Sequence, residues 1–166
     1  MNPPLTELTL TSSRMRLRRA TVDDLPAIVR LLAADALGSA RENLAEGDLA
    51  PYERAFRMID ADPAHLLVVA VGAPPGEAVV ATMQLSFLPG LSRRGALRAQ
   101  VEAVRVDTAL RGQGLGAAMM GWAIEEARRR GCDLVQLTTD KSRADAHRFY
   151  ERLGFVASHE GMKLRL

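Results

Sequence analysis

Residues 98–140 constrain the fold most, because three regular elements follow one another there with only short connections. The stretch RAQVEAVRVD (98–107) predicts a strand, GLGAAMMGWAIEEARRRG (114–131) a helix that ends at Gly131, and DLVQLTTD (133–140) a buried strand. Two strands joined by one helix are expected to be parallel neighbours with a right-handed crossover. Alternation divides the first strand into two faces, Val101, Ala103 and Arg105 on one and Glu102, Val104 and Val106 on the other.

Other segments extend this unit in both directions. Strands are predicted over 15–20, 65–72 and 79–88, the last two as a hairpin, and helices after Thr21 and over 51–63. RADAHRFYERLG (143–154) predicts a helix that ends at Gly154, and the segment from Phe155 predicts one last strand or hairpin. At 166 residues, this order predicts a single α/β domain over 1–166, with a mixed sheet and helices on both faces.

Composition argues against several classes of protein. The 22 basic and 20 acidic residues nearly cancel, so we expect no basic surface of the kind that nucleic acid requires. Cys132 is the only cysteine, which excludes a disulfide framework and a thiolate metal cluster, and no metal is expected. The sequence shows no signal peptide, and no apolar run approaches the roughly 20 residues that span a membrane. We therefore expect a cytoplasmic protein.

The segment RGQGLGA (111–117) follows the predicted strand and opens the helix, where a phosphate could bind. A nucleotide P-loop is excluded, because alanine stands where that loop needs lysine and then serine or threonine. Gly112, Gly114 and Ala117 match the dinucleotide pattern, but that loop starts directly at a strand end, and here residues 107–111 intervene. The pattern R-x-x-G-x-G, from Arg111 to Gly116, suits a pyrophosphate held by backbone amides without a metal.

These residues resemble a known family. AVRVDTALRGQGLGAAMM, with RADAHRFYERLGF following about 35 residues later, is similar to the two signature regions of the GCN5-related N-acetyltransferases, the GNAT superfamily. The resemblance covers about residues 98–156, the expected coenzyme-binding core. It implies a mostly antiparallel mixed sheet whose two central parallel strands splay apart near Val106.

The resemblance also implies acetyl-coenzyme A as the co-substrate. Its pantetheine would pair with the backbone of Val104 and Val106, like an added strand. Its pyrophosphate would bind the loop made of Arg111, Gly112, Gln113, Gly114, Leu115 and Gly116.

Catalytic roles follow from the same resemblance. Tyr150 aligns with the tyrosine that many members place beside the coenzyme sulfur, so it is the expected acid for the departing thiolate. Its alternative role is packing against Phe149 and Phe155. Glu102, central in the strand beside the thioester, is the candidate base, with a water molecule as the alternative. The backbone N–H of Val104 or its neighbour is the implied donor to the oxyanion.

One residue departs from the family pattern. Arg143 stands where many members have an asparagine that contacts pantetheine, and it is expected near the coenzyme phosphates or an acidic acceptor instead. His147, one helical turn before Tyr150, is interpreted as a surface or acceptor-site residue.

The acceptor is less constrained than the coenzyme. Four acidic residues could bind a cationic amine: Asp35, Glu42, Glu46 and Asp48. The arginines of LSRRGALR (91–98) could suit an acidic or phosphorylated acceptor, and solvated segments are the alternative for both groups. The predicted function is an N-acetyltransferase acting on a primary amine of a small molecule, without nucleic acid or membrane as partner. A protein or peptide N-acetyltransferase and a non-catalytic acetyl-coenzyme A sensor are the alternatives, and a homodimer stays open.

Overall fold

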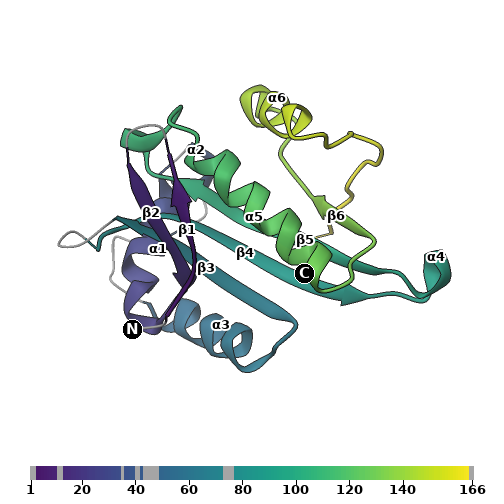
Figure 1. The fold of residues 1–166 in the computed structure, drawn as a ribbon, viewed down its shortest axis with the longest axis horizontal. Coiled ribbons are helices and arrows are strands. Elements are labelled where there is room, and N and C mark those ends of the chain that lie inside the picture. The colour runs from purple at the N-terminus through teal and green to yellow at the C-terminus, as the bar shows by residue number, and fades with distance from the viewer. Residues whose placement is uncertain are drawn as a thin grey trace. The chain divides into compact units, whose positions relative to one another are not determined.

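The computed structural model describes residues 3–10, 13–34, 36–39, 42, 49–72 and 77–164. These residues form a six-stranded sheet in the order β1-β2-β3-β4-β5-β6 (Figure 1). The strands are β1 (Pro4–Thr9), β2 (Arg14–Arg19), β3 (His65–Gly72), β4 (Val79–Pro89), β5 (Leu97–Val106) and β6 (Leu134–Leu137). Neighbours from β1 through β5 are antiparallel, which confirms the expected mostly antiparallel mixed sheet.

Helices and short helical turns connect the strands. They are η1 (Val22–Asp24), α1 (Leu25–Ala33), α2 (Ala36–Ser39), α3 (Ala50–Ala61), α4 (Ser92–Gly95), η2 (Thr108–Leu110), α5 (Leu115–Arg129) and α6 (Ala144–Arg152). The helices predicted after Thr21, over 51–63, over 114–130 and over 143–154 are therefore confirmed, with ends that differ by a few residues.

The predicted parallel pair lies between β5 and β6. The N–H of Asp133 donates to the carbonyl of Leu97 at 2.8 Å, and Nε2 of Gln136 donates to Oε1 of Gln100 at 2.7 Å. Both partners advance by three residues in the same direction, so the strands run parallel, and α5 connects them. β6 has 4 residues and is shorter than the predicted strand over 133–140.

The strand β1 is missing from the sequence prediction. It pairs antiparallel with β2, and the N–H of Leu10 donates to the carbonyl of Ser13 at 2.9 Å. Only Leu8 within β1 is buried, because β1 lies at the edge of the sheet. An edge strand with one buried side chain leaves almost no alternation in its sequence, and this is why the pattern did not reveal it.

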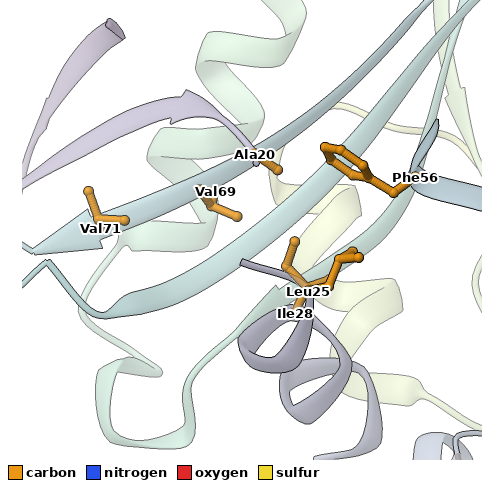
Figure 2. Packing of buried hydrophobic residues seen from close by; sticks show 6 residues of the cluster. All are labelled: Ala20, Leu25, Ile28, Phe56, Val69 and Val71. Atoms are coloured by element: carbon orange, nitrogen blue, oxygen red, sulfur yellow. The ribbon is translucent and has the colours of Figure 1, made fainter. Parts of the chain in front are cut away.

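One face of the sheet packs against α1 and α3. Leu25 and Ile28 of α1 and Phe56 of α3 form a cluster with Val69 and Val71 of β3 and with Ala20 (Figure 2). Thr82 of β4 pairs with Val69 and lies on the same face. We call this side of the sheet the α1 face.

The opposite side, the α5 face, is also apolar. The β3 side chains that alternate with the α1-face residues are fully buried: Leu66, Val68 and Ala70. The helix α5 contacts β5, β1 and β4. It carries a matching set of buried apolar residues: Leu115, Met119, Met120, Ala123 and Ala127. Helices therefore cover both faces, as the sequence predicts.

A buried ion pair anchors the start of α1 to β2. Arg18 of β2 donates to both carboxylate oxygens of Asp24, at 2.7 and 2.9 Å, and both side chains are about nine-tenths buried. Asp24 also accepts from the backbone N–H of Thr21 at 2.7 Å. Burial alone would raise the pKa of Asp24, but the hydrogen bonds from Arg18 and Thr21 outweigh it and lower the pKa.

Asp24→Asn should lower the free energy of unfolding by about 3 kcal/mol at neutral pH, because it leaves the guanidinium of Arg18 buried without a counter-charge. The ionised Asp24 stabilises the fold above the carboxyl's usual pKa of 3.8, and this contribution is lost as the pH falls through the lower folded-state pKa. The difference between wild type and variant should therefore narrow below about pH 4. Urea unfolding over a pH series measures this, with Asp23→Asn as an exposed control; a constant difference down to low pH would contradict it.

Residues Leu137–Leu166 form a second compact unit. Its helix α6 ends where Gly154 adopts φ +89°, and the N–H of Phe155 donates back to the carbonyl of Tyr150 at 3.1 Å. Between Phe155 and Leu164, all of which the structure describes, there is no strand, so the predicted last strand or hairpin is wrong there. A strand needs one buried face, but the apolar side chains of Val156, Met162 and Leu164 are exposed.

Candidate active site

The loop between β5 and α5 begins with an ordered turn. The side chain of Asp107 accepts from the N–H of Ala109 at 2.9 Å and starts the turn η2. Two glycines then adopt positive φ angles, Gly112 at +78° and Gly114 at +87°, and α5 begins at the next residue. This left-handed backbone is open to glycine at no steric cost, which is the physical reason for the glycine spacing in the sequence.

This loop presents a run of backbone N–H groups without partners. The structure gives acceptors for the N–H groups of Arg111, Gln113 and Ala118. Within the described residues, it gives none for the N–H groups that lie between them: those of Gly112, Gly114, Leu115, Gly116 and Ala117. Four of these belong to the N-terminus of a 15-residue helix, whose dipole favours a negative charge.

Space for a ligand lies over the same glycines. A Cβ atom added at Gly112 or Gly114 would meet no protein atom within 4 Å. The glycines are therefore not required by close packing of the protein against itself. Unpaired amides, a helix N-terminus and open space together make this loop suited to a phosphate or another anion.

A β-bulge interrupts β5 immediately before this loop. In the pairing with β4, Ala103 and Val104 both lie opposite the single residue Met83. Ala103 adopts φ +53°, a left-handed conformation that costs a non-glycine residue about 1–2 kcal/mol. Bulges turn backbone groups out of the regular ladder and are common beside active sites. The sequence did not predict it, because the strained residue is alanine and carries no turn signal.

The bulge also corrects the predicted faces of β5. One extra residue reverses the alternation, so every side chain after it changes face. Glu102 pairs with Gln84 and Arg105 pairs with Thr82, so both lie on the α1 face. Val106 lies on the α5 face. The prediction that Glu102 and Val106 share a face is therefore wrong, and Glu102 points toward the side that holds α1 and α3.

Tyr150 lies in the second unit, within α6. Its ring makes edge-to-face contacts with Phe149, at 5.0 Å between centroids, and with Phe155, at 5.9 Å. These contacts hold the ring in place through its edges and faces. Nε2 of His147 lies 3.1 Å from the carbonyl oxygen of Asp140, so this imidazole has a structural partner inside its own unit.

The remaining predicted residues divide into two groups. Val104, Val106 and the loop from Arg111 to Gly116 follow one another along β5, η2 and the start of α5, so one continuous segment carries them. Of the four acidic residues, only Glu42 is described; it accepts a hydrogen bond from the hydroxyl of Tyr52 at 2.6 Å. Asp35, Glu46 and Asp48 lie outside the described residues.

Among the described residues, no group of three or more histidine, cysteine, aspartate or glutamate side chains is placed to hold a metal ion. In the same part of the chain, no helix combines the length and the apolar character that crossing a membrane requires.

Comparison with known proteins supports one family. The model of the acetyltransferase (GNAT) family matches residues 29–155. The chain is 43% identical over 60 residues to the aminoalkylphosphonate N-acetyltransferase of Salmonella typhimurium, covering 36% of this chain and 39% of that relative. It is 35% identical over 92 residues to a glucosamine 6-phosphate N-acetyltransferase of Trypanosoma brucei brucei, covering 55% of this chain and 60% of that relative. The chain thus spans about two to three fifths of the curated relatives it matches.

A solved structure covers more of the chain. A protein described as a transcriptional regulator from Bacillus halodurans superposes with a TM-score of 0.86 at 47% identity, covering 92% of this chain and 99% of that one. A glucosamine-6-phosphate N-acetyltransferase from Arabidopsis thaliana shares the fold, with a TM-score of 0.73 at 19% identity.

Proposed function

Because the chain belongs to the acetyltransferase (GNAT) family, we propose that it transfers an acetyl group from acetyl-coenzyme A to a primary amine of a small molecule. The observation that carries this proposal is the set of unpaired N–H groups of Gly112 and of Gly114 to Ala117, in the loop that follows a bulged strand. Two matched relatives are named for small amines that carry a phosphonate or a phosphate, which supports a small-molecule acceptor.

In this proposal the loop holds the coenzyme. The N–H groups of Gly112, Gly114, Leu115 and Gly116 donate to the pyrophosphate, and Arg111, which is exposed, shields its edge. The pantetheine lies along the backbone of Val104 and Val106, which follow the strained Ala103 of the bulge. No metal takes part.

The reaction is direct attack of the amine on the thioester. An alkyl ammonium has a pKa near ~10.4, so a proton must leave before its nitrogen can attack, and Glu102 or a water molecule accepts that proton. A carbon–nitrogen bond forms, and the N–H of Val104 or its neighbour donates to the carbonyl oxygen as it becomes negative. The carbon–sulfur bond then breaks, and the thiolate takes a proton from the hydroxyl of Tyr150. The nitrogen releases its second proton to water, which gives the amide, and Tyr150 regains a proton from water.

The proposal also extends to the domain organisation, to Arg143 and to the location and partners of the protein. The family match spans both compact units, so we infer that they make up one N-acetyltransferase domain. Arg143, at the N-terminal end of α6, is assigned to the coenzyme phosphates or an acidic acceptor. A cytoplasmic location, a homodimer and the absence of a nucleic-acid partner stay predictions.

One observation favours a second candidate function. The relative with 47% identity is described as a transcriptional regulator, which fits an acetyl-coenzyme A sensor without turnover. A protein or peptide N-acetyltransferase is the alternative within the enzyme class.

Release of free coenzyme A thiol separates these functions. The protein is mixed with acetyl-coenzyme A and a panel of small amines, peptides and an amine-free control, and calorimetry measures coenzyme binding in parallel. We expect binding and thiol release that depends on a small amine. Binding without thiol release identifies a sensor, release only with peptides identifies the peptide enzyme, and no binding overturns the proposal.

A further inference from the structure

On the α1 face, β3 is mostly apolar and β2 carries Arg16 and Arg18, whereas β4 and β5 are largely polar. We call the polar part the polar strip; it consists of Thr82, Gln84, Ser86, Arg98, Gln100, Glu102 and Arg105. The pairing of β4 with β5 places Thr82 opposite Arg105, Gln84 opposite Glu102 and Ser86 opposite Gln100, while Arg98 lies opposite the apolar Leu88. Without the bulge, Arg105 would lie on the other face, so the bulge adds this one residue to the strip.

Along β5 the strip has a defined order of charge. Arg98, Gln100 and Glu102 occupy every second position and therefore point the same way, giving a cation, an amide and a carboxylate in a row. Their Cα atoms extend over about 13 Å, at roughly 3.3 Å per residue. The amide of Gln100 is held in place by the 2.7 Å hydrogen bond that its Oε1 accepts from Gln136.

Arg98 differs from Arg16 and Arg18, two other arginines of the sheet. Arg18 is paired with Asp24, and Arg16 with Glu77. In the part of the chain that the structure describes, the half-buried side chain of Arg98 has no carboxylate partner; its Nε is buried without a hydrogen-bond acceptor, as are the Nε atoms of Arg16, Arg18 and Arg105. A half-buried guanidinium without a carboxylate partner is suited to an anion that arrives with a ligand.

The structure also separates Arg98 from the other arginines of 91–98. Arg93 and Arg94 lie in the exposed turn α4 between β4 and β5, whereas Arg98 lies inside β5 and is half-buried. An exposed arginine is already solvated and gains little from an anion, while a half-buried one gains more because water screens it less.

From this arrangement we propose that the acceptor amine also carries an anionic group, and that Arg98 binds this anion while Glu102 faces the amine. The inference rests on the proposed function and specifies the substrate class of the same site. The carboxylate is the member of the row next to the bulge, and the bulge is where the thioester is placed in the proposed reaction. The cation at the far end of the row then selects molecules with a negative charge away from their amine.

Matched acceptors test this specificity. ω-Aminoalkylphosphonates, ω-amino acids and ω-amino alcohols of equal chain lengths differ only in the group opposite the amine, and kcat/KM is measured for each by thiol release. We expect the anionic amines to exceed the matching alcohols by about 10- to 100-fold, the worth of one hydrogen bond to a charged group. The phosphonate and carboxylate series show which anion the site prefers.

The variant Arg98→Gln should lower kcat/KM for the anionic amines by about 10- to 100-fold, mainly through KM, and change the alcohols less than threefold. Arg98→Lys, which keeps the charge, should recover part of the preference, and both variants should keep the melting temperature. Arg57→Gln, an exposed arginine on α3, is the matched control and should change nothing.

Two results overturn this inference. One is an equal loss of activity toward anionic and neutral amines in Arg98→Gln, which indicates a structural role. The other is a wild-type enzyme that acetylates the alcohols as well as the anionic amines. Both differ from failure of the proposed function, in which no amine releases thiol from acetyl-coenzyme A at all.

Discussion

Replacing Tyr150 with phenylalanine should lower kcat by about 10²- to 10⁴-fold, the usual contribution of general acid catalysis. The hydroxyl would supply the proton to the departing thiolate, and phenylalanine lacks that proton. The affinity for acetyl-coenzyme A should change little, because the lost interaction belongs to the transition state. Steady-state kinetics and calorimetry measure the two effects separately.

The packing of Tyr150 makes this substitution a clean test. Its ring contacts Phe149 and Phe155 edge to face, and a phenylalanine ring preserves both contacts. Tyr150→Phe should therefore keep the melting temperature, whereas Tyr150→Leu should lower it as well as kcat. The opposite result is a kcat for Tyr150→Phe within about threefold of wild type, with chemistry shown to be rate-limiting. Tyr150 would then have a packing role and would not be the acid.

Replacing Gly114 with alanine should weaken acetyl-coenzyme A binding by about 100-fold or more. A Cβ there would occupy the open space over the loop and hold the pyrophosphate away from the N–H groups, and each hydrogen bond to a charged acceptor contributes about 1.5–3 kcal/mol. A β-branched residue is a poorer choice, because φ is +87° and the substitution strains the backbone as well. Calorimetry measures the affinity.

Gly131 provides a matched control at the other end of α5. It also has a positive φ, +74°, and open space for a Cβ, so alanine there costs a similar strain of about 1–2 kcal/mol. Gly131→Ala should lower stability as much as Gly114→Ala does and leave binding unchanged.

Arg111→Ala should weaken binding less than Gly114→Ala, because an exposed contact with a phosphate is screened by water and salt. Equal affinities for wild type and Gly114→Ala would contradict a phosphate site.

Where the pattern of side chains is strong, the fold could be read from the sequence. The helix α5 has a long apolar stripe and ends at a glycine, and β3 and β4 are apolar runs in the sequence, so each was predicted within a few residues. The edge strand β1 and the segment after Phe155 were not predicted correctly, because their side chains are mostly exposed and burial there is decided by neighbouring elements.

The candidate site divides in the same way. The glycine loop was visible in the sequence, because Gly112 and Gly114 adopt backbone angles that other residues avoid. The bulge at Ala103 was not visible, since alanine in a left-handed conformation is held there by the pairing of β4 with β5 and by nothing in its own side chain.

By itself, then, the sequence determined the local elements, the parallel β5–α5–β6 crossover and the loop at the start of α5, because helix periodicity and glycine conformations act over a few residues. Only the tertiary structure decided which face each side chain of β5 occupies. Because the ladder contains one additional residue, Arg105 lies on the α1 face beside Glu102, and Val106 lies on the α5 face. It likewise decided which arginine is paired, since Arg18 meets Asp24 and Arg98 meets no carboxylate among the described residues. Such pairings depend on strands and turns distant in the chain, and no short-range pattern encodes them.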